Sequence, residues 1–73
     1  AEAEANFRDI LVNSPQDVQA TVGLGIALAK QFKLDGADAL FDRVLTTDPN
    51  NATAYAGKAT VMLNRLQSSS GSI

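Results

Sequence analysis

Residues 3–15 read AEANFRDILVNSP, and residues 37–49 read ADALFDRVLTTDP. The second segment repeats the first after 34 positions, so that Phe7 corresponds to Phe41. The other identical pairs are Ala3 and Ala37, Ala5 and Ala39, Leu11 and Leu45, Pro15 and Pro49, Ala20 and Ala54, and Gly23 and Gly57. A fixed period of about 20 to 50 residues is typical of solenoids, in which copies of one unit stack on each other. The repeat therefore favours a binding function over catalysis.

The composition argues against several classes of site. The 73 residues are enough for one small domain. The chain has no cysteine and no histidine, so it lacks disulfides, thiolate metal sites and the commonest general base. A net charge of −2 weighs against nucleic-acid binding, which requires clustered basic residues. No apolar run approaches the roughly 20 residues of a membrane span, and no signal peptide opens the chain. We therefore expect no cofactor, metal, nucleic-acid partner or membrane insertion, and a cytoplasmic location by default.

Apolar residues spaced three and four apart predict four helices. Their expected ranges are 1–13, 18–31, 36–47 and 52–67. Pro15 and Pro49 end the first and third helices, because a residue before proline disfavours helical geometry. Asp17 and Asn51 are expected to cap the second and fourth helices. Residues 68–73 are rich in serine and are expected to form a disordered tail or linker.

The second and third helices together resemble one complete tetratricopeptide repeat, helix A followed by helix B. The slots of helix A hold Thr21, Leu24, Gly25 and Leu28, and those of helix B hold Ala37, Phe41, Val44 and Pro49. The first helix resembles a helix B alone (Ala3, Phe7, Ile10, Pro15), and the fourth resembles a helix A alone (Tyr55, Ala59, Met62). This resemblance covers residues 1–67. It implies one all-α domain, a right-handed solenoid of helical hairpins with about four antiparallel helices.

In such a fold these residues serve packing. Gly25 and Ala59 are expected to let an A helix approach its neighbour closely, and Phe7 and Phe41 to fill the grooves between helices. Three positions depart from the family pattern. Thr21 replaces a bulky aromatic residue, Lys58 replaces leucine and must extend its amine outward, and Phe32 occupies a tight turn where the family places glycine. We expect the Phe32 ring to be exposed and the fourth helix to pack less tightly than the second.

The resemblance implies that function resides on the concave face, which the A helices line. The positions expected there are Gln19, Val22, Gly23, Ile26, Lys30, Thr53, Ala56, Gly57, Thr60 and Asn64. One subgroup of the family binds acidic C-termini through basic and amide side chains, but Val22 and Ile26 stand where that clamp needs them. The expected groove is neutral and apolar, which favours an apolar helix or extended peptide as its ligand.

The incomplete repeats suggest a second hypothesis. The chain begins with a B helix that has no A helix and ends with an A helix that has no B helix. The second and fourth helices are apolar on most sides, which favours burial beyond one face. The expected function is therefore a protein–protein interaction module or scaffold. The alternative is a structural self-assembly unit, a homodimer or a solenoid continued across copies; a fragment of a longer array would explain the same features.

Catalysis finds little support in the sequence. The acidic residues are scattered, and Asp38 and Asp42, one helical turn apart, are more consistent with a solvated pair than with an acid/base couple. The run from Gly23 to Gly25 lacks the third glycine and the preceding strand of a nucleotide-binding loop. We predict that the chain is not an enzyme.

Overall fold

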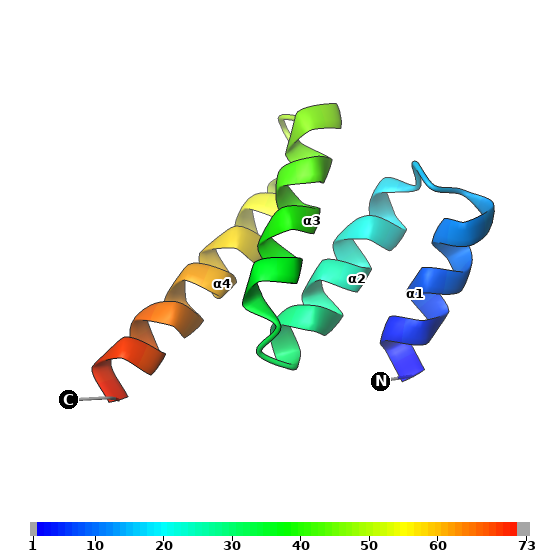
Figure 1. The fold of residues 1–73 in the computed structure, drawn as a ribbon. Coiled ribbons are helices and arrows are strands. Elements are labelled where there is room, and N and C mark those ends of the chain that lie inside the picture. The colour runs from blue at the N-terminus through cyan, green and yellow to red at the C-terminus, as the bar shows by residue number, and fades with distance from the viewer. Residues whose placement is uncertain (1, 72–73) are drawn as a thin grey trace.

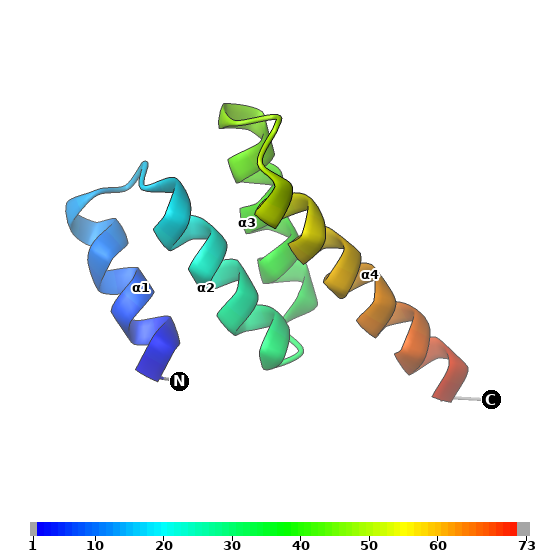
Figure 2. The same cartoon turned by 180° about the vertical axis from the view of Figure 1, so that it is seen from behind.

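The computed structural model describes residues 2–71, which form four α-helices and no strand. The helices are α1 (Glu2–Asn13), α2 (Val18–Lys30), α3 (Leu34–Thr47) and α4 (Ala52–Gly71). They run in alternating directions and each packs against the next, while α2 also packs against α4 (Figure 1). Seen from behind, α2 lies between α1 and the pair formed by α3 and α4 (Figure 2). The prediction of an all-helical chain is confirmed.

Two predicted caps start α2 and α4. The Asp17 carboxylate accepts a hydrogen bond from the Ala20 amide at 2.9 Å, at the start of α2. The Asn51 side-chain oxygen accepts from the Ala54 amide, also at 2.9 Å, at the start of α4. Each cap satisfies an amide that has no partner inside its own helix, so both helices begin where the sequence predicts.

The last helix is longer than predicted. We expected α4 to end near Gln67 and residues 68–73 to be disordered, whereas α4 continues to Gly71. Serine costs a helix only a few tenths of a kcal/mol (roughly 0.5) relative to alanine, and extending an existing helix is far easier than starting one. No proline or glycine interrupts the chain between Gly57 and Gly71. Ser72 and Ile73, the rest of the predicted tail, lie outside the described residues.

The turn between α2 and α3 is shorter than predicted, and α3 begins at Leu34. Phe32 has a φ of 60°, in the left-handed region. Its amide donates to the Ala29 carbonyl at 3.0 Å, and the Lys33 amide donates to the Leu28 carbonyl at 2.9 Å. These two bonds are those of a Schellman motif, which usually has glycine at the left-handed position. The Phe32 side chain is 65% exposed, as predicted.

The Phe41 ring is the centre of the core and is fully buried. It lies against two glycines, Gly25 of α2 and Gly57 of α4. A Cβ atom at either glycine would lie less than 3.0 Å from the ring. The Phe7 ring lies in the same way against Gly23 of α2. The other buried apolar residues are Ala20, Val22, Leu24, Leu28, Ala29, Ala37, Val44, Ala54 and Val61. The 34-residue repeat of the sequence is thus also a repeat of one ring-on-glycine contact.

Gly25 lets α2 approach the Phe41 ring closely, as expected, but Ala59 does not pack against a neighbour. Ala59 is exposed, because residues 2–71 place no helix on that side of α4. Thr21 is 4% exposed, and its hydroxyl donates to the Asp17 carbonyl at 2.9 Å. A hollow of about 190 Å³ remains beside Thr21 and Val44. It lies where the resemblance expects a bulky aromatic side chain.

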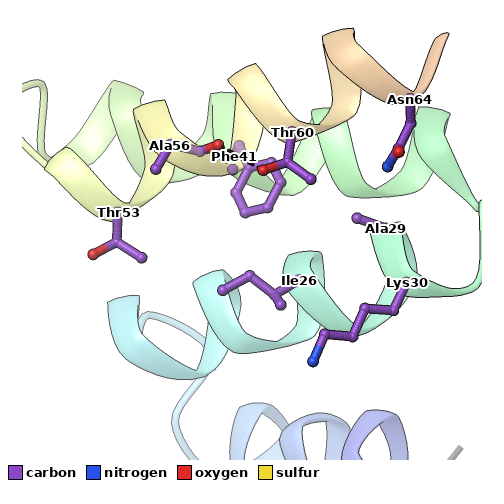
Figure 3. Close-up of a pocket in the computed structure, with 9 residues that line it drawn as sticks. Ile26, Ala29, Lys30, Phe41, Thr53, Ala56, Thr60 and Asn64 are labelled. Atoms are coloured by element: carbon purple, nitrogen blue, oxygen red, sulfur yellow. Dashed lines mark hydrogen bonds between the residues drawn. The ribbon is translucent and has the colours of Figure 1, made fainter. Parts of the chain in front are cut away.

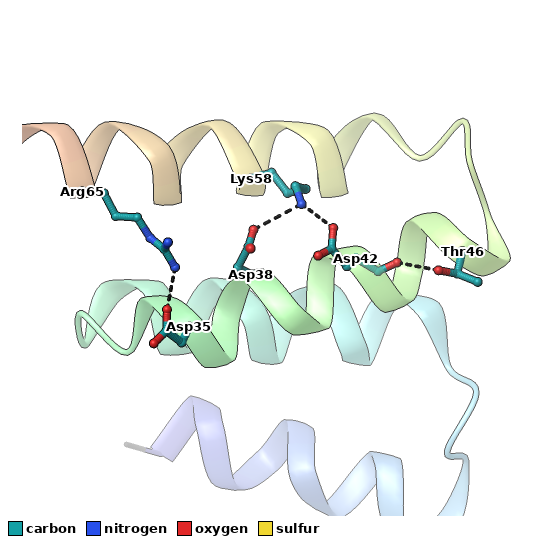
Figure 4. A network of polar contacts seen from close by, with 6 residues as sticks. All are labelled: Asp35, Asp38, Asp42, Thr46, Lys58 and Arg65. Atoms are coloured by element: carbon teal, nitrogen blue, oxygen red, sulfur yellow. Dashed lines mark hydrogen bonds and ion pairs between the residues drawn. The ribbon is translucent and has the colours of Figure 1, made fainter.

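Acidic residues of α3 form ion pairs with the basic residues of α4 (Figure 4). The Lys58 amine lies 3.3 Å from an Asp38 carboxylate oxygen and is also bound by Asp42, while Arg65 pairs with Asp35 at 2.7 Å. The hydrogen bond to Asp42 raises the pKa of Lys58, against the opposing effect of partial desolvation. Lys58 therefore extends along the α3–α4 seam, and Asp38 and Asp42 do share a face, where both contact the Lys58 amine.

Candidate functional site

A hollow of about 310 Å³ opens between α2 and α4 (Figure 3). It is lined by Ile26, Ala29, Lys30, Phe41, Thr53, Ala56, Gly57, Thr60 and Asn64. A second hollow of about 450 Å³ lies between α1, α2 and the start of α4, and is lined by Phe7, Val18, Gln19, Val22, Gly23, Ile26, Asn51 and Thr53. Ile26 and Thr53 belong to both, so the two hollows form one continuous surface, which we term the α2–α4 groove.

All ten residues predicted for the concave face line this groove, but they do not contribute equally. The exposed members are Gln19, Ile26, Lys30, Thr53, Ala56 and Thr60, and the half-buried members are Gly23 and Asn64. Val22 and Gly57 are buried. The structure therefore brings together the residues that the sequence assigned to one face.

Three of the ten serve mainly to form the floor of the groove. Val22 is 7% exposed and belongs to the core, whereas Gly23 and Gly57 provide the space that the Phe7 and Phe41 rings occupy. Fewer residues are therefore accessible to a ligand than predicted, and Ile26 is the main apolar side chain among them, with 37% of its surface exposed.

Five residues line the groove that the sequence did not predict there: Phe7, Val18, Ala29, Phe41 and Asn51. The two rings were expected only to fill the grooves beside Ala3 and Ala37. The signal was present in the repeat, since each phenylalanine has a glycine sixteen positions later. Because glycine has no side chain, the Phe7 ring at Gly23 and the Phe41 ring at Gly57 reach the floor of the groove.

The electrostatic character of the groove is simple. Neither α2 nor α4 carries an acidic residue, and the two basic residues of α4 point to α3. Among the described residues, Lys30 is the one charged side chain that lines the groove, and it forms no ion pair within residues 2–71. Asn64 lies toward one end of the hollow and Thr53 toward the other, while the Lys30 side chain runs along α2 with its amine pointing away from α4 (Figure 3). The groove therefore offers an apolar centre with one amide at its end and one positive charge at its edge.

The hydroxyl of Thr60 is already engaged, because it donates to the Ala56 carbonyl at 3.1 Å. It presents its methyl group and an accepting oxygen rather than a free donor. Within residues 2–71 no group of three or more acidic side chains is placed to share a metal ion. None of the described helices combines the length and the apolar character of a membrane span.

A separate polar cluster joins α1 to the end of α2, outside the groove. The Gln31 amide donates to Glu4 at 2.7 Å, Arg8 pairs with the same carboxylate at 3.0 Å, and Lys33 approaches it at 3.8 Å. The hydrogen bonds from Gln31 and Arg8 lower the pKa of Glu4 below its usual value against the opposing effect of desolvation, and the charges of Lys33 and Arg8 add to the lowering.

No family model matches this chain, and comparisons with curated proteins and with solved structures give no match either. The resemblance to tetratricopeptide repeats therefore rests on the residues of this chain alone.

Proposed function

We propose that this protein is a protein–protein interaction module, a tetratricopeptide-like right-handed solenoid that binds a partner segment in the α2–α4 groove. The repeated ring-on-glycine contact supports the solenoid, because it relates α1 to α2 as it relates α3 to α4. The carrying observation is the groove itself, an apolar hollow between two helices without acidic residues. The same reasoning gives no role in catalysis.

The partner suited to this groove is an amphipathic helix or an extended peptide with one large apolar side chain. A hollow of about 310 Å³ is at the lower end of the size of ligand pockets, which suits an apolar anchor residue rather than a whole helix. An acidic side chain of the partner would lie at the edge of the groove beside α2, where it meets the Lys30 charge without any competing acid from α2 or α4. The partner is thus an apolar segment with an acidic flank.

Selection from a displayed library of random peptides tests this proposal. The wild-type chain is expected to enrich peptides with a large apolar residue and an acidic neighbour, and the variant Ile26→Asp is expected to lose them. Val12→Asp is the matched control, because Val12 is 77% exposed on α1 and does not line the groove. Enrichment that survives Ile26→Asp, or that Val12→Asp also removes, would contradict binding in the groove.

The acidic flank is tested by charge removal. Lys30→Gln is expected to weaken the selected peptides about threefold to tenfold, with a smaller dependence on salt. Lys33→Gln removes the same charge three residues away and outside the groove, so it should leave affinity nearly unchanged. Equal effects of the two variants would show that only the net charge matters.

A second candidate function, self-assembly, is favoured by a different surface. Tyr55, Met62 and Leu66 are large and more than half exposed on α4. They do not line the groove, so the two functions can be tested separately.

A further inference from the structure

The outer side of α4 carries an apolar stripe that nothing in residues 2–71 covers. Its members are Tyr55, Ala59, Met62 and Leu66, spaced four, three and four residues apart, which places them on one face of the helix. Tyr55 is 55% exposed, Met62 61% and Leu66 59%. We term this surface the α4 outer stripe.

The repeat shows what such a stripe does when it is covered. Thr21, Gly25 and Leu28 of α2 stand 34 positions before Tyr55, Ala59 and Met62. On α2 these positions are buried: Thr21 and Leu28 are 4% and 5% exposed, and Gly25 receives the Phe41 ring of α3. A B-type helix thus covers this stripe on α2, whereas none of the helices within residues 2–71 covers the corresponding stripe on α4.

The complementary half of this contact is present at the other end of the chain. Ala3, Phe7 and Ile10 of α1 correspond to Ala37, Phe41 and Val44, which α3 buries against its neighbours. Val44 is 2% exposed, whereas Ile10 is 44% exposed. The α1 helix uses one side against α2 and leaves open the side on which α3 meets its own A helix.

Charge favours pairing these two ends with each other. On α1 the acidic residues outnumber the single Arg8, while α4 carries Lys58 and Arg65 and no acid. Lys58 and Arg65 already pair with α3, so the opposite net charges of α1 and α4 favour the approach of these two ends, while the apolar stripe carries the contact itself.

We propose that α1 of a second copy packs on the α4 outer stripe, as α3 packs on α2 within the chain. The Phe7 ring of the second copy would then lie over Ala59 as Phe41 lies over Gly25. The Phe7 ring would lie farther from the α4 backbone than Phe41 lies from α2, because Ala59 has a Cβ atom and a Cβ at Gly25 would lie less than 3.0 Å from the ring. Because the contact is head to tail, a pair of copies keeps one free α1 face and one free α4 outer stripe, so assembly continues beyond two copies.

Sedimentation and light scattering between about 1 μM and about 1 mM test the proposal. The wild-type mass is expected to rise beyond twice 7.7 kDa as concentration increases. Met62→Asp and Ile10→Asp should each weaken association by at least about thirtyfold, because each places a charge in the apolar contact. Val12→Asp is the control, since Val12 is exposed and corresponds to Thr46, which is exposed on α3. Helicity followed by circular dichroism checks that every variant is folded.

Mixing the two disrupted variants gives the sharpest result. The Met62→Asp chain retains its α1 face, and the Ile10→Asp chain retains its α4 outer stripe, so together they have one intact contact. A 1:1 mixture is therefore expected to form pairs and nothing larger. A wild type that stays monomeric would overturn the proposal, as would a mixture that stays monomeric. Loss of association in Met62→Asp alone would overturn it in favour of an α4–α4 contact.

Discussion

The protein is expected to be more stable with glycine at position 32 than with alanine there, which is the reverse of the order found inside helices. The φ of 60° at Phe32 is left-handed, which costs a residue with a Cβ atom about 1–2 kcal/mol. Glycine avoids this cost but raises the entropy of the unfolded chain, which offsets about 0.4–1 kcal/mol. We therefore expect the free energy of unfolding of the Phe32→Gly variant to be about 1 kcal/mol higher than that of the Phe32→Ala variant.

The comparison uses two variants because the ring itself contributes. Phe32 is 65% exposed, so its covered third stabilises the native state by up to about 1 kcal/mol. Both variants lose that contribution, and their difference isolates the backbone. For a domain of this size, about 1 kcal/mol corresponds to a difference in Tm of about 4–8 °C.

Urea unfolding followed by circular dichroism measures both free energies. Ala39→Gly is the control: Ala39 is exposed within α3, and glycine should destabilise that position by about 1 kcal/mol. If Phe32→Ala proves as stable as Phe32→Gly, the turn does not impose a left-handed conformation, and the reasoning fails.

Three further predictions concern the caps, the glycines and the α3–α4 seam. Asn51→Ala should lower the free energy of unfolding by about 1 kcal/mol and the helicity of α4, measured by urea unfolding and circular dichroism. Gly57→Ala should destabilise by about 1–3 kcal/mol, because its methyl group would strike the Phe41 ring. Gly36→Ala, where the nearest atom to a new Cβ lies at 3.4 Å, should be neutral or stabilising; equal losses at both glycines would contradict this account. The raised pKa of Lys58 contributes stability below its usual value of 10.5, which is lost as pH rises through the higher folded value. Lys58→Met should therefore flatten the loss of stability above about pH 10.5 in alkaline unfolding curves, and an unchanged slope would exclude this contribution.

Features that depend on neighbouring residues were predictable from the sequence. The Asp17 and Asn51 caps form within one turn of the chain, and the prolines act on the residue before them. The end of α4 was not predictable in this way, because Ser68 to Ser70 neither favour nor stop a helix strongly. The same holds for Ala59, whose role depends on whether another helix lies beyond it.

The groove was predicted as a set of residues but not as a surface. The period of 34 residues identified which positions share a face, and the structure gathers all ten of them. The repeat pairs each phenylalanine with the glycine sixteen positions later, but it could not show that the Phe41 ring would also lie against Gly25 of α2. Nor could it show that Lys30 alone would bring charge to the groove, since Lys58 and Arg65 lie on the same helix and turn to α3.

The position of Phe41 has a consequence for how the chain unfolds. One ring fills seats on both α2 and α4, so fraying of α4 would expose a side chain that also holds the α2–α3 hairpin together. The cooperative unit is therefore three helices rather than two, and amides of α2 and the first turns of α4 should exchange with solvent hydrogen at similar rates. A fragment that ends at Asp48 would lack α4 and therefore the contact between the Phe41 ring and Gly57. The packing of α4 on the α2–α3 hairpin thus contributes to the stability of the hairpin itself.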